Sequence, residues 1–249
     1  MTETLYQNQV DPSLQLGSQD YSEQTVSFDL LREPDAITET LEVFQRDHLL
    51  ARAIDAPMYS RHGLNFDVID NEVELMGGKG GMKHVSSTLL IPGEGVRVYK
   101  PLGFLVDSER TGIEYVAEGD SLSNVDSGGQ LQAINGNVST LSELAQLIHK
   151  THTKDMNEVN VTLPTDAVRG LFTIDAPRAK LDALVTRHHL QREGKGVLPV
   201  FTYDQDQGSL VQWEPTGEET AALLGSVRTE EIRMKYAEAL PAHDFLLVA

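Results

Sequence analysis

Glu158 is the residue whose type and position in this sequence most directly suggest catalysis. Apolar Val159 and Val161 alternate with Glu158 and Asn160, and this period of two predicts a half-buried strand over residues 158–163. Because the apolar side chains are expected to face a core, Glu158 begins the opposite, polar face. A carboxylate at the mouth of a strand can be a catalytic group, or it can be a solubility-promoting charge on an edge strand.

Basic residues that could work with this carboxylate occur upstream in two places. Arg61 and His62 belong to Tyr59-Ser-Arg-His-Gly63, and Arg97 lies in a short segment that we expect to be a strand over residues 96–99. A guanidinium or an imidazolium can hold a phosphate group through charge-assisted hydrogen bonds. Arg61 or His62, with Arg97 as the alternative, are therefore candidates for anion binding.

Two other kinds of site are suggested by short motifs. Gly77-Gly-Lys-Gly-Gly81 is predicted to be a loop, which can cradle a phosphate with its backbone amides or simply connect two elements. It lacks the ending of the nucleotide-binding loop. His149 and His152 lie near Asp155, but the chain has no cysteine and no His-Glu-x-x-His pattern. We therefore predict no metal site.

The remaining patterns predict a mixed α+β fold with mostly antiparallel strands. Thr140 and Glu143 form a capping box for a helix over residues 140–150. We expect further helices over residues 35–55, 176–191 and 229–240, strands over residues 84–91, 96–99, 103–107, 113–117 and 167–174, and a hairpin of residues 197–203 with 209–213. The turns at residues 107–112 and 164–166 are each expected to join the strands beside them as a hairpin.

The domain organisation is predicted to be simple. Residues 1–25 are polar, and we expect them to form a flexible N-terminal arm. Residues 26–249 are expected to form a single α+β domain, because no linker interrupts them. Residues 118–138 carry few apolar side chains and are predicted to be a long exposed loop.

The sequence around Glu158 resembles the catalytic strand of ADP-ribosyltransferases. Asn157-Glu-Val-Asn-Val161, followed by Pro164-Thr-Asp-Ala-Val-Arg-Gly-Leu-Phe172, is similar to the glutamate strand and its hairpin partner in poly-ADP-ribose polymerases and related toxins. That superfamily also has an Arg or His on an early core strand and often a Ser-Thr-Ser-like strand before the glutamate. Tyr59-Ser-Arg-His-Gly63 resembles the first of these and Ser86-Ser-Thr88 the second. Met156 departs from the toxin pattern, which usually has Glu or Gln at that position.

The resemblance implies a strongly bent or split antiparallel sheet flanked by helices, with NAD as co-substrate and a protein or other macromolecule as the acceptor of ADP-ribose. It implies that Glu158 is catalytic and stabilises the oxocarbenium-like state formed as nicotinamide leaves. Arg61 or His62, or alternatively Arg97, would bind the pyrophosphate or the adenosine ribose. Ser87 would support the strand and the nicotinamide ribose. Such an enzyme would fit a bacterial effector or toxin.

The charge of the chain limits its partners and also supports a second function. The sequence has 38 acidic and 20 basic residues, a formal net charge of −18, so we expect no nucleic-acid partner. No apolar run approaches the roughly 18 residues that would span a bilayer, and we expect no membrane contact. We recognise no secretory signal in the sequence. The expected location is therefore the cytoplasm or, after secretion without a cleaved signal peptide, a host cytosol. The alternative function is a non-catalytic acidic binding protein, of the inhibitor or immunity type, which covers a basic partner surface.

Overall fold

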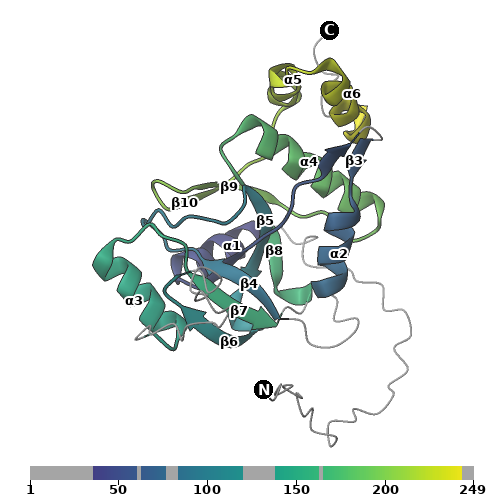
Figure 1. Ribbon diagram of the computed structural model, residues 1–249. Helices are drawn as coiled ribbons and strands as arrows, with labels where there is room; N and C mark the ends of the chain where they lie inside the picture. Colours follow the sequence, from purple (N-terminus) through teal and green to yellow (C-terminus); the bar gives the residue numbers. More distant parts are fainter. Residues whose placement is uncertain (1–35, 61–62, 77–83, 120–137, 163–164, 243–249) are drawn as a thin grey trace, which may run out of the picture.

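The computed structural model describes residues 36–60, 63–76, 84–119, 138–162 and 165–242, which form an α+β fold around one large sheet (Figure 1). The sheet has eight strands in the order β10-β9-β8-β5-β1-β4-β7-β6. Its neighbouring strands are antiparallel, apart from the parallel pair of β8 and β9. The predicted α+β class with a mostly antiparallel sheet is confirmed.

The strands are short, and one junction of the sheet is much shorter than the others. β1 pairs with β4 over two residue pairs, the last joining Ala51 to Thr88, whereas β1 pairs with β5 over five. The β1–β4 ladder therefore ends at Ala51, which makes this the shortest junction in the sheet. The strands are β1 (Leu49–Ala53), β4 (His84–Leu89), β5 (Leu102–Asp107), β6 (Gly112–Ala117), β7 (Glu158–Thr162), β8 (Val168–Ile174), β9 (Val200–Asp204) and β10 (Ser209–Gln212), with a separate hairpin of β2 (Met58–Ser60) and β3 (Gly63–Asn65).

Helices cover both faces of the sheet (Figure 1). They are α1 (Ala36–Gln45), α2 (Asp67–Met76), α3 (Leu141–Thr151), α4 (Pro177–Arg192), α5 (Gly217–Ser226) and α6 (Glu230–Ala239). Phe44 of α1 belongs to the core cluster that contains Leu49 and Ala51 of β1. Leu50, on the opposite face of the same strand, belongs to the cluster that includes residues of α2, α3 and α4. α5 and α6 pack against α4.

The helix predicted over residues 35–55 is wrong in its second half. Helix α1 ends at Gln45, and Asp47 adopts a left-handed conformation with φ of 60°, which reverses the chain into β1. β1 begins with the buried residues Leu49, Leu50 and Ala51. A strand buried on both faces reads as a continuous apolar run, and such a run cannot be told from a helix by periodicity alone.

Both predicted turn-linked hairpins are also wrong. β7 lies between β4 and β6, and β8 lies between β5 and β9, so the strands on either side of residues 164–166 are far apart in the sheet. β5 pairs with β1 and β8 rather than with β6. In both cases the strands pair with partners that are distant in the sequence, and turn residues between two strands do not indicate such long-range pairing.

The segment over residues 96–99 is not a strand. The N–H of Arg97 donates to the carbonyl of Lys154, and the N–H of Val98 donates to the side chain of Gln205. These bonds replace a strand ladder.

Helix α5, which we did not predict, begins with a capping box of Thr216 and Glu219. The predictions confirmed within a few residues are the helices over 140–150, 176–191 and 229–240, the strands over 84–91, 103–107, 113–117, 158–163 and 167–174, and the hairpin of β9 with β10. Residues 1–25 and 77–81 and most of 118–138 lie outside the described residues.

Candidate functional site

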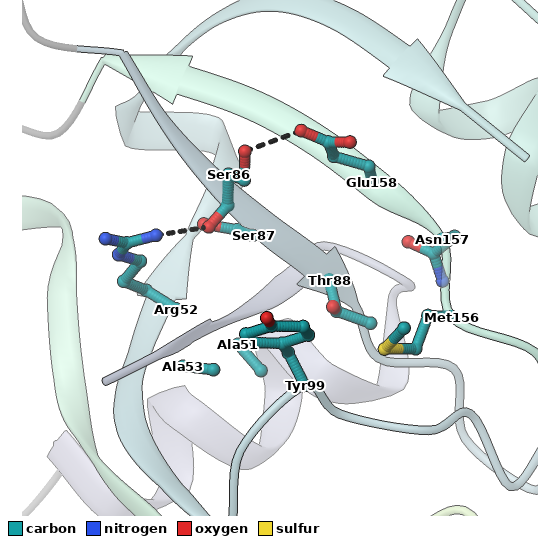
Figure 2. Close-up of a pocket in the computed structure, with 10 residues that line it drawn as sticks. All are labelled: Ala51, Arg52, Ala53, Ser86, Ser87, Thr88, Tyr99, Met156, Asn157 and Glu158. Atoms are coloured by element: carbon teal, nitrogen blue, oxygen red, sulfur yellow. Dashed lines mark hydrogen bonds between the residues drawn. The ribbon is translucent and has the colours of Figure 1, made fainter. Parts of the chain in front are cut away.

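A pocket of about 230 Å³ opens at the short junction of the sheet, over β1, β4 and the start of β7 (Figure 2). Glu158 lies on its lining, together with the Ser86-Ser-Thr88 strand. The two segments that the sequence singled out for chemistry therefore meet at one concavity. The lining residues are Ala51, Arg52 and Ala53 of β1, Ser86, Ser87 and Thr88 of β4, Tyr99, and Met156, Asn157 and Glu158.

Glu158 is a buried carboxylate held by two hydroxyl groups. The residue is 6% exposed, and β7 is an interior strand, so Glu158 is not the solubility charge of an edge strand. The Ser86 hydroxyl donates to Oε1 of Glu158 at 2.5 Å, and the Tyr115 hydroxyl donates to the same oxygen at 2.6 Å. A buried charge is tolerated only where it is paired or hydrogen-bonded, and these two donors fulfil that condition.

The residue before Glu158 fixes the backbone of the site. The side-chain amide of buried Asn157 bonds to the backbone of Leu89 in both directions: Oδ1 accepts from the N–H at 2.8 Å, and Nδ2 donates to the carbonyl at 3.1 Å. The amide thus mimics one rung of the β4–β7 ladder. It holds the start of β7, and with it Glu158, at a fixed place beside the end of β4.

The pleat of β4 gives the two neighbouring serines different environments. Ser86 pairs with Asn160 and Ser87 pairs with Val159, so Ser86 lies on the face of Glu158 and Ser87 points to the opposite face. Ser87, the serine that we predicted to be functional, is buried, and its hydroxyl has no hydrogen-bond partner among the described residues. Ser86 is the serine that contacts the carboxylate (Figure 2).

Arg52 is the basic residue of the pocket lining, and sequence reasoning missed it. Its guanidinium forms a two-pronged ion pair with Glu72 of α2, with NH2 to Oε1 at 2.9 Å and Nε to Oε2 at 3.2 Å. It also donates to the backbone carbonyl of Ser86 at 3.0 Å (Figure 2). The side chain is 20% exposed, so a ligand in the pocket could reach it. The apolar run of β1 hid this residue within a predicted helix.

The basic residues predicted from the sequence are not brought to this pocket by the described part of the chain. Arg97 is exposed and is not part of the pocket lining. Arg61 and His62 lie outside the described residues. Arg52, on β1, is the basic side chain that the described part of the chain places on the pocket lining.

Tyr99 gives the pocket an aromatic wall. Its side chain is 64% exposed and lies beside Thr88 and the small side chains of Ala51 and Ala53 (Figure 2). The ammonium of Lys100 lies 5.6 Å from the centre of the ring and is paired with Asp55. An exposed ring next to small residues leaves a flat space in which a planar group can stack.

The histidines considered for a metal site each contact an acidic side chain. His149 contacts Asp47 at 3.2 Å, and His152 contacts Glu94 at 3.0 Å. Among the described residues, no group of three or more His, Cys, Asp or Glu side chains is arranged to hold a metal ion. The helices in the same part of the chain include none with the length and apolar character needed to cross a bilayer.

No protein-family model and no curated protein matches the chain.

Proposed function

We propose that this protein is an ADP-ribosyltransferase that uses the pocket over β1, β4 and β7 to cleave NAD. The observation that carries the proposal is the convergence of Arg52, Ser86 and Glu158 on one pocket from strands that are neighbours in the sheet. They occur along the chain as a basic residue, a Ser/Thr strand and a glutamate. This is the order found in the superfamily that the sequence resembles.

The chemistry assigns a direct role to Glu158. The bond between C1′ of the ribose and the nicotinamide nitrogen breaks, its electron pair leaves with nicotinamide, and positive charge develops on the ribose, as in glycoside hydrolysis. A buried carboxylate next to that ribose stabilises the charge as it forms. The acceptor then forms a bond to C1′ and loses a proton, which yields the ADP-ribosylated product.

The size and lining of the pocket suit the nicotinamide end of the dinucleotide. Pockets that enclose a whole drug-sized ligand usually have about 300–1,000 Å³, whereas this pocket has about 230 Å³. A nicotinamide ring with its ribose is smaller than a whole drug-sized ligand and would fit in this volume, and the adenosine half of NAD would extend out of the pocket. Tyr99 would stack on the nicotinamide, and the ribose hydroxyls would reach Glu158.

Arg52 would bind the pyrophosphate that links the two halves. A guanidinium binds phosphate oxygens in two-pronged fashion, and Arg52 already binds the Glu72 carboxylate in that way. The Glu72 carboxylate thus occupies the donor atoms that a phosphate would use.

The acceptor is the part of the reaction that the pocket specifies least. Met156, an apolar side chain, lines the pocket two residues before Glu158, where the toxins that the sequence resembles usually have Glu or Gln. Met156 has neither a carboxylate nor an amide with which to assist a guanidine or amide nucleophile. A protein acceptor that attacks C1′ through a more nucleophilic group, or water, fits this lining better.

The experiment that tests the proposal follows two products at once. The protein is incubated with NAD labelled in the adenylate phosphate, and both nicotinamide release and label transfer to added proteins are measured. We expect turnover by the wild type and a loss of about 10²-fold or more with Glu158→Gln, which keeps the shape of the side chain but removes its charge. Glu218→Gln, an exposed substitution in the first turn of α5, is the matched control and should retain full activity.

A second function, acidic binding protein, is favoured by the net charge of −18. The first turns of α5 and α6 each present two glutamates, Glu218 with Glu219 and Glu230 with Glu231, and all four are exposed. A complex held by such charges should weaken steeply between low salt, with a Debye length of about 30 Å at 0.01 M, and physiological salt, with about 8 Å at 0.15 M. Binding to a basic partner that does not change over this range would contradict this alternative.

A further inference from the structure

We propose that Tyr115 is a positioning residue that fixes the orientation of the Glu158 carboxylate for NAD cleavage. This inference rests on the proposed function and adds to it a residue that neither the sequence pattern nor the resemblance indicated. Tyr115 lies on β6, on the far side of β7 from the Ser/Thr strand. It is not part of the pocket lining, so it acts through Glu158 rather than by touching the substrate.

The contacts of Glu158 show how the orientation is set. The terminal torsion of a glutamate side chain is broad, so the plane of its carboxylate is not fixed by the chain itself. Ser86 donates to Oε1 from β4 at 2.5 Å, and Tyr115 donates to the same oxygen from β6 at 2.6 Å. Two donors that approach one oxygen from the two neighbouring strands prevent rotation of the carboxylate. Together they decide which way the second oxygen faces.

A β-bulge in β6 brings Tyr115 to the correct face of the sheet. Ile113 pairs with Val161, but Tyr115 pairs with Asn160, because the register shifts between them. With a regular register, Tyr115 would pair with Val159 and would face the core side of the sheet, away from Glu158. A shift of one residue moves a side chain to the other face, and bulges often re-aim side chains next to active sites. Glu114 is the extra residue that produces this shift.

The positioning role predicts a specific kinetic pattern. Tyr115→Phe removes the hydroxyl and leaves the ring in place. A hydrogen bond to a charged group is stronger than one between neutral groups. Loss of the one that orients Glu158 should therefore lower kcat for nicotinamide release by about ten- to hundredfold. The KM for NAD and the affinity for ADP-ribose should change less than about twofold, since Tyr115 contacts neither NAD nor ADP-ribose. A residue that only stabilised the fold would lower the thermal midpoint without this split between kcat and KM.

The bulge offers a matched control for Tyr115→Phe. Deletion of Glu114 removes the extra residue, and Tyr115 then follows Ile113 directly and stays opposite Asn160, on the face of Glu158. We expect this deletion to retain wild-type kcat, because the tyrosine hydroxyl can still donate to Glu158. Tyr115→Phe made in the same deletion background should lower kcat as it does in the full sequence.

The outcomes separate this inference from the proposed function. If the wild type releases no nicotinamide, the proposed function fails and the inference fails with it. If the wild type is active and folded Tyr115→Phe retains its kcat, the inference is wrong while the proposed function stands. The inference is also wrong if Tyr115→Phe raises KM and weakens ADP-ribose binding with kcat unchanged, because Tyr115 would then contact the substrate. A kcat loss in Tyr115→Phe with KM and ADP-ribose affinity little changed, and wild-type kcat in the Glu114 deletion, supports it.

Discussion

The guanidinium of Arg52 donates to the backbone carbonyl of Ser86 at 3.0 Å, at the point where the β1–β4 ladder ends. A side chain thus takes the place of a strand hydrogen bond and satisfies a carbonyl that lies beyond the end of this ladder. The same guanidinium is paired with Glu72 of α2. One residue therefore links β1, β4 and helix α2 at the edge of the pocket.

Replacement of Arg52 should affect substrate binding more than the chemical step. Arg52→Lys keeps the positive charge but loses the planar fork that binds Glu72 and reaches Ser86. We expect KM for NAD to rise by about tenfold, the equivalent of one charge-assisted hydrogen bond, with a much smaller change in kcat. Steady-state kinetics at several NAD concentrations measure both. An unchanged KM would show that Arg52 serves only to hold the sheet.

Glu72 should compete with the ligand for Arg52. Glu72→Gln preserves the size of the side chain but no longer neutralises the guanidinium. We expect ADP-ribose to bind about two- to fivefold more tightly, because solvent-accessible charge pairs contribute about 1 kcal/mol or less and this competition is removed. Isothermal titration calorimetry of the two proteins tests this. Weaker binding by Glu72→Gln would mean that Glu72 orients Arg52 for the ligand instead of competing with it.

Tyr99 should contribute through its ring and not through its hydroxyl. Stacking of a base on an aromatic side chain is worth about 1–3 kcal/mol by alanine substitution, so Tyr99→Ala should weaken NAD binding by about five- to hundredfold. Tyr99→Phe keeps the ring and should bind NAD within about twofold of the wild type, since the stacking surface is the same. Equal affinities for all three proteins would place the nicotinamide elsewhere in the pocket.

The packing of α6 on α4 should make stability depend on pH. The Tyr236 hydroxyl donates to Asp182 at 2.6 Å in a buried contact, and burial raises the pKa of Asp182 from 3.8 to about 6. The folded protein therefore keeps this proton where the unfolded chain loses it, so stability falls as pH rises from about 4 to about 6. The contribution over this window is about 3 kcal/mol.

Asp182→Asn isolates this contribution. Free energies of unfolding of the wild type and of Asp182→Asn, measured by urea denaturation at a series of pH values, give a difference from which the other titrating groups largely cancel. We expect the wild type to lose stability relative to Asp182→Asn as pH rises from about 4 to about 6. Parallel curves for the two proteins would show that Asp182 titrates normally in the fold.

The sequence was most informative where the deciding interactions are local. The alternation around Glu158, the capping box of Thr140 with Glu143 and the Ser86-Ser-Thr88 strand were all read correctly as elements, and two of them supply the pocket. Which of Ser86 and Ser87 lies on the face of Glu158 depends on the pairing of β4 with β7, a long-range property that the sequence of β4 alone does not show.

The features that the sequence does not predict depend on contacts between residues far apart in the chain. Arg52 lies in a strand that is buried on both faces, and such a strand has no alternation of apolar and polar residues that would identify it. The positions of β7 and β8 depend on partners distant in sequence, so the turn at residues 164–166 gave the wrong pairing. Tyr115 reaches Glu158 only because of a one-residue bulge, and no residue type in β6 signals that shift.

The measurement that tests the central claim most directly is nicotinamide release from NAD by the wild type and by Glu158→Gln, at equal concentrations and with both proteins shown to be folded. The proposed function predicts release by the wild type and at least about 10²-fold slower release by the variant. Equal release by the two proteins, or none by the wild type with NAD in excess and acceptor proteins present, would contradict a catalytic role for Glu158.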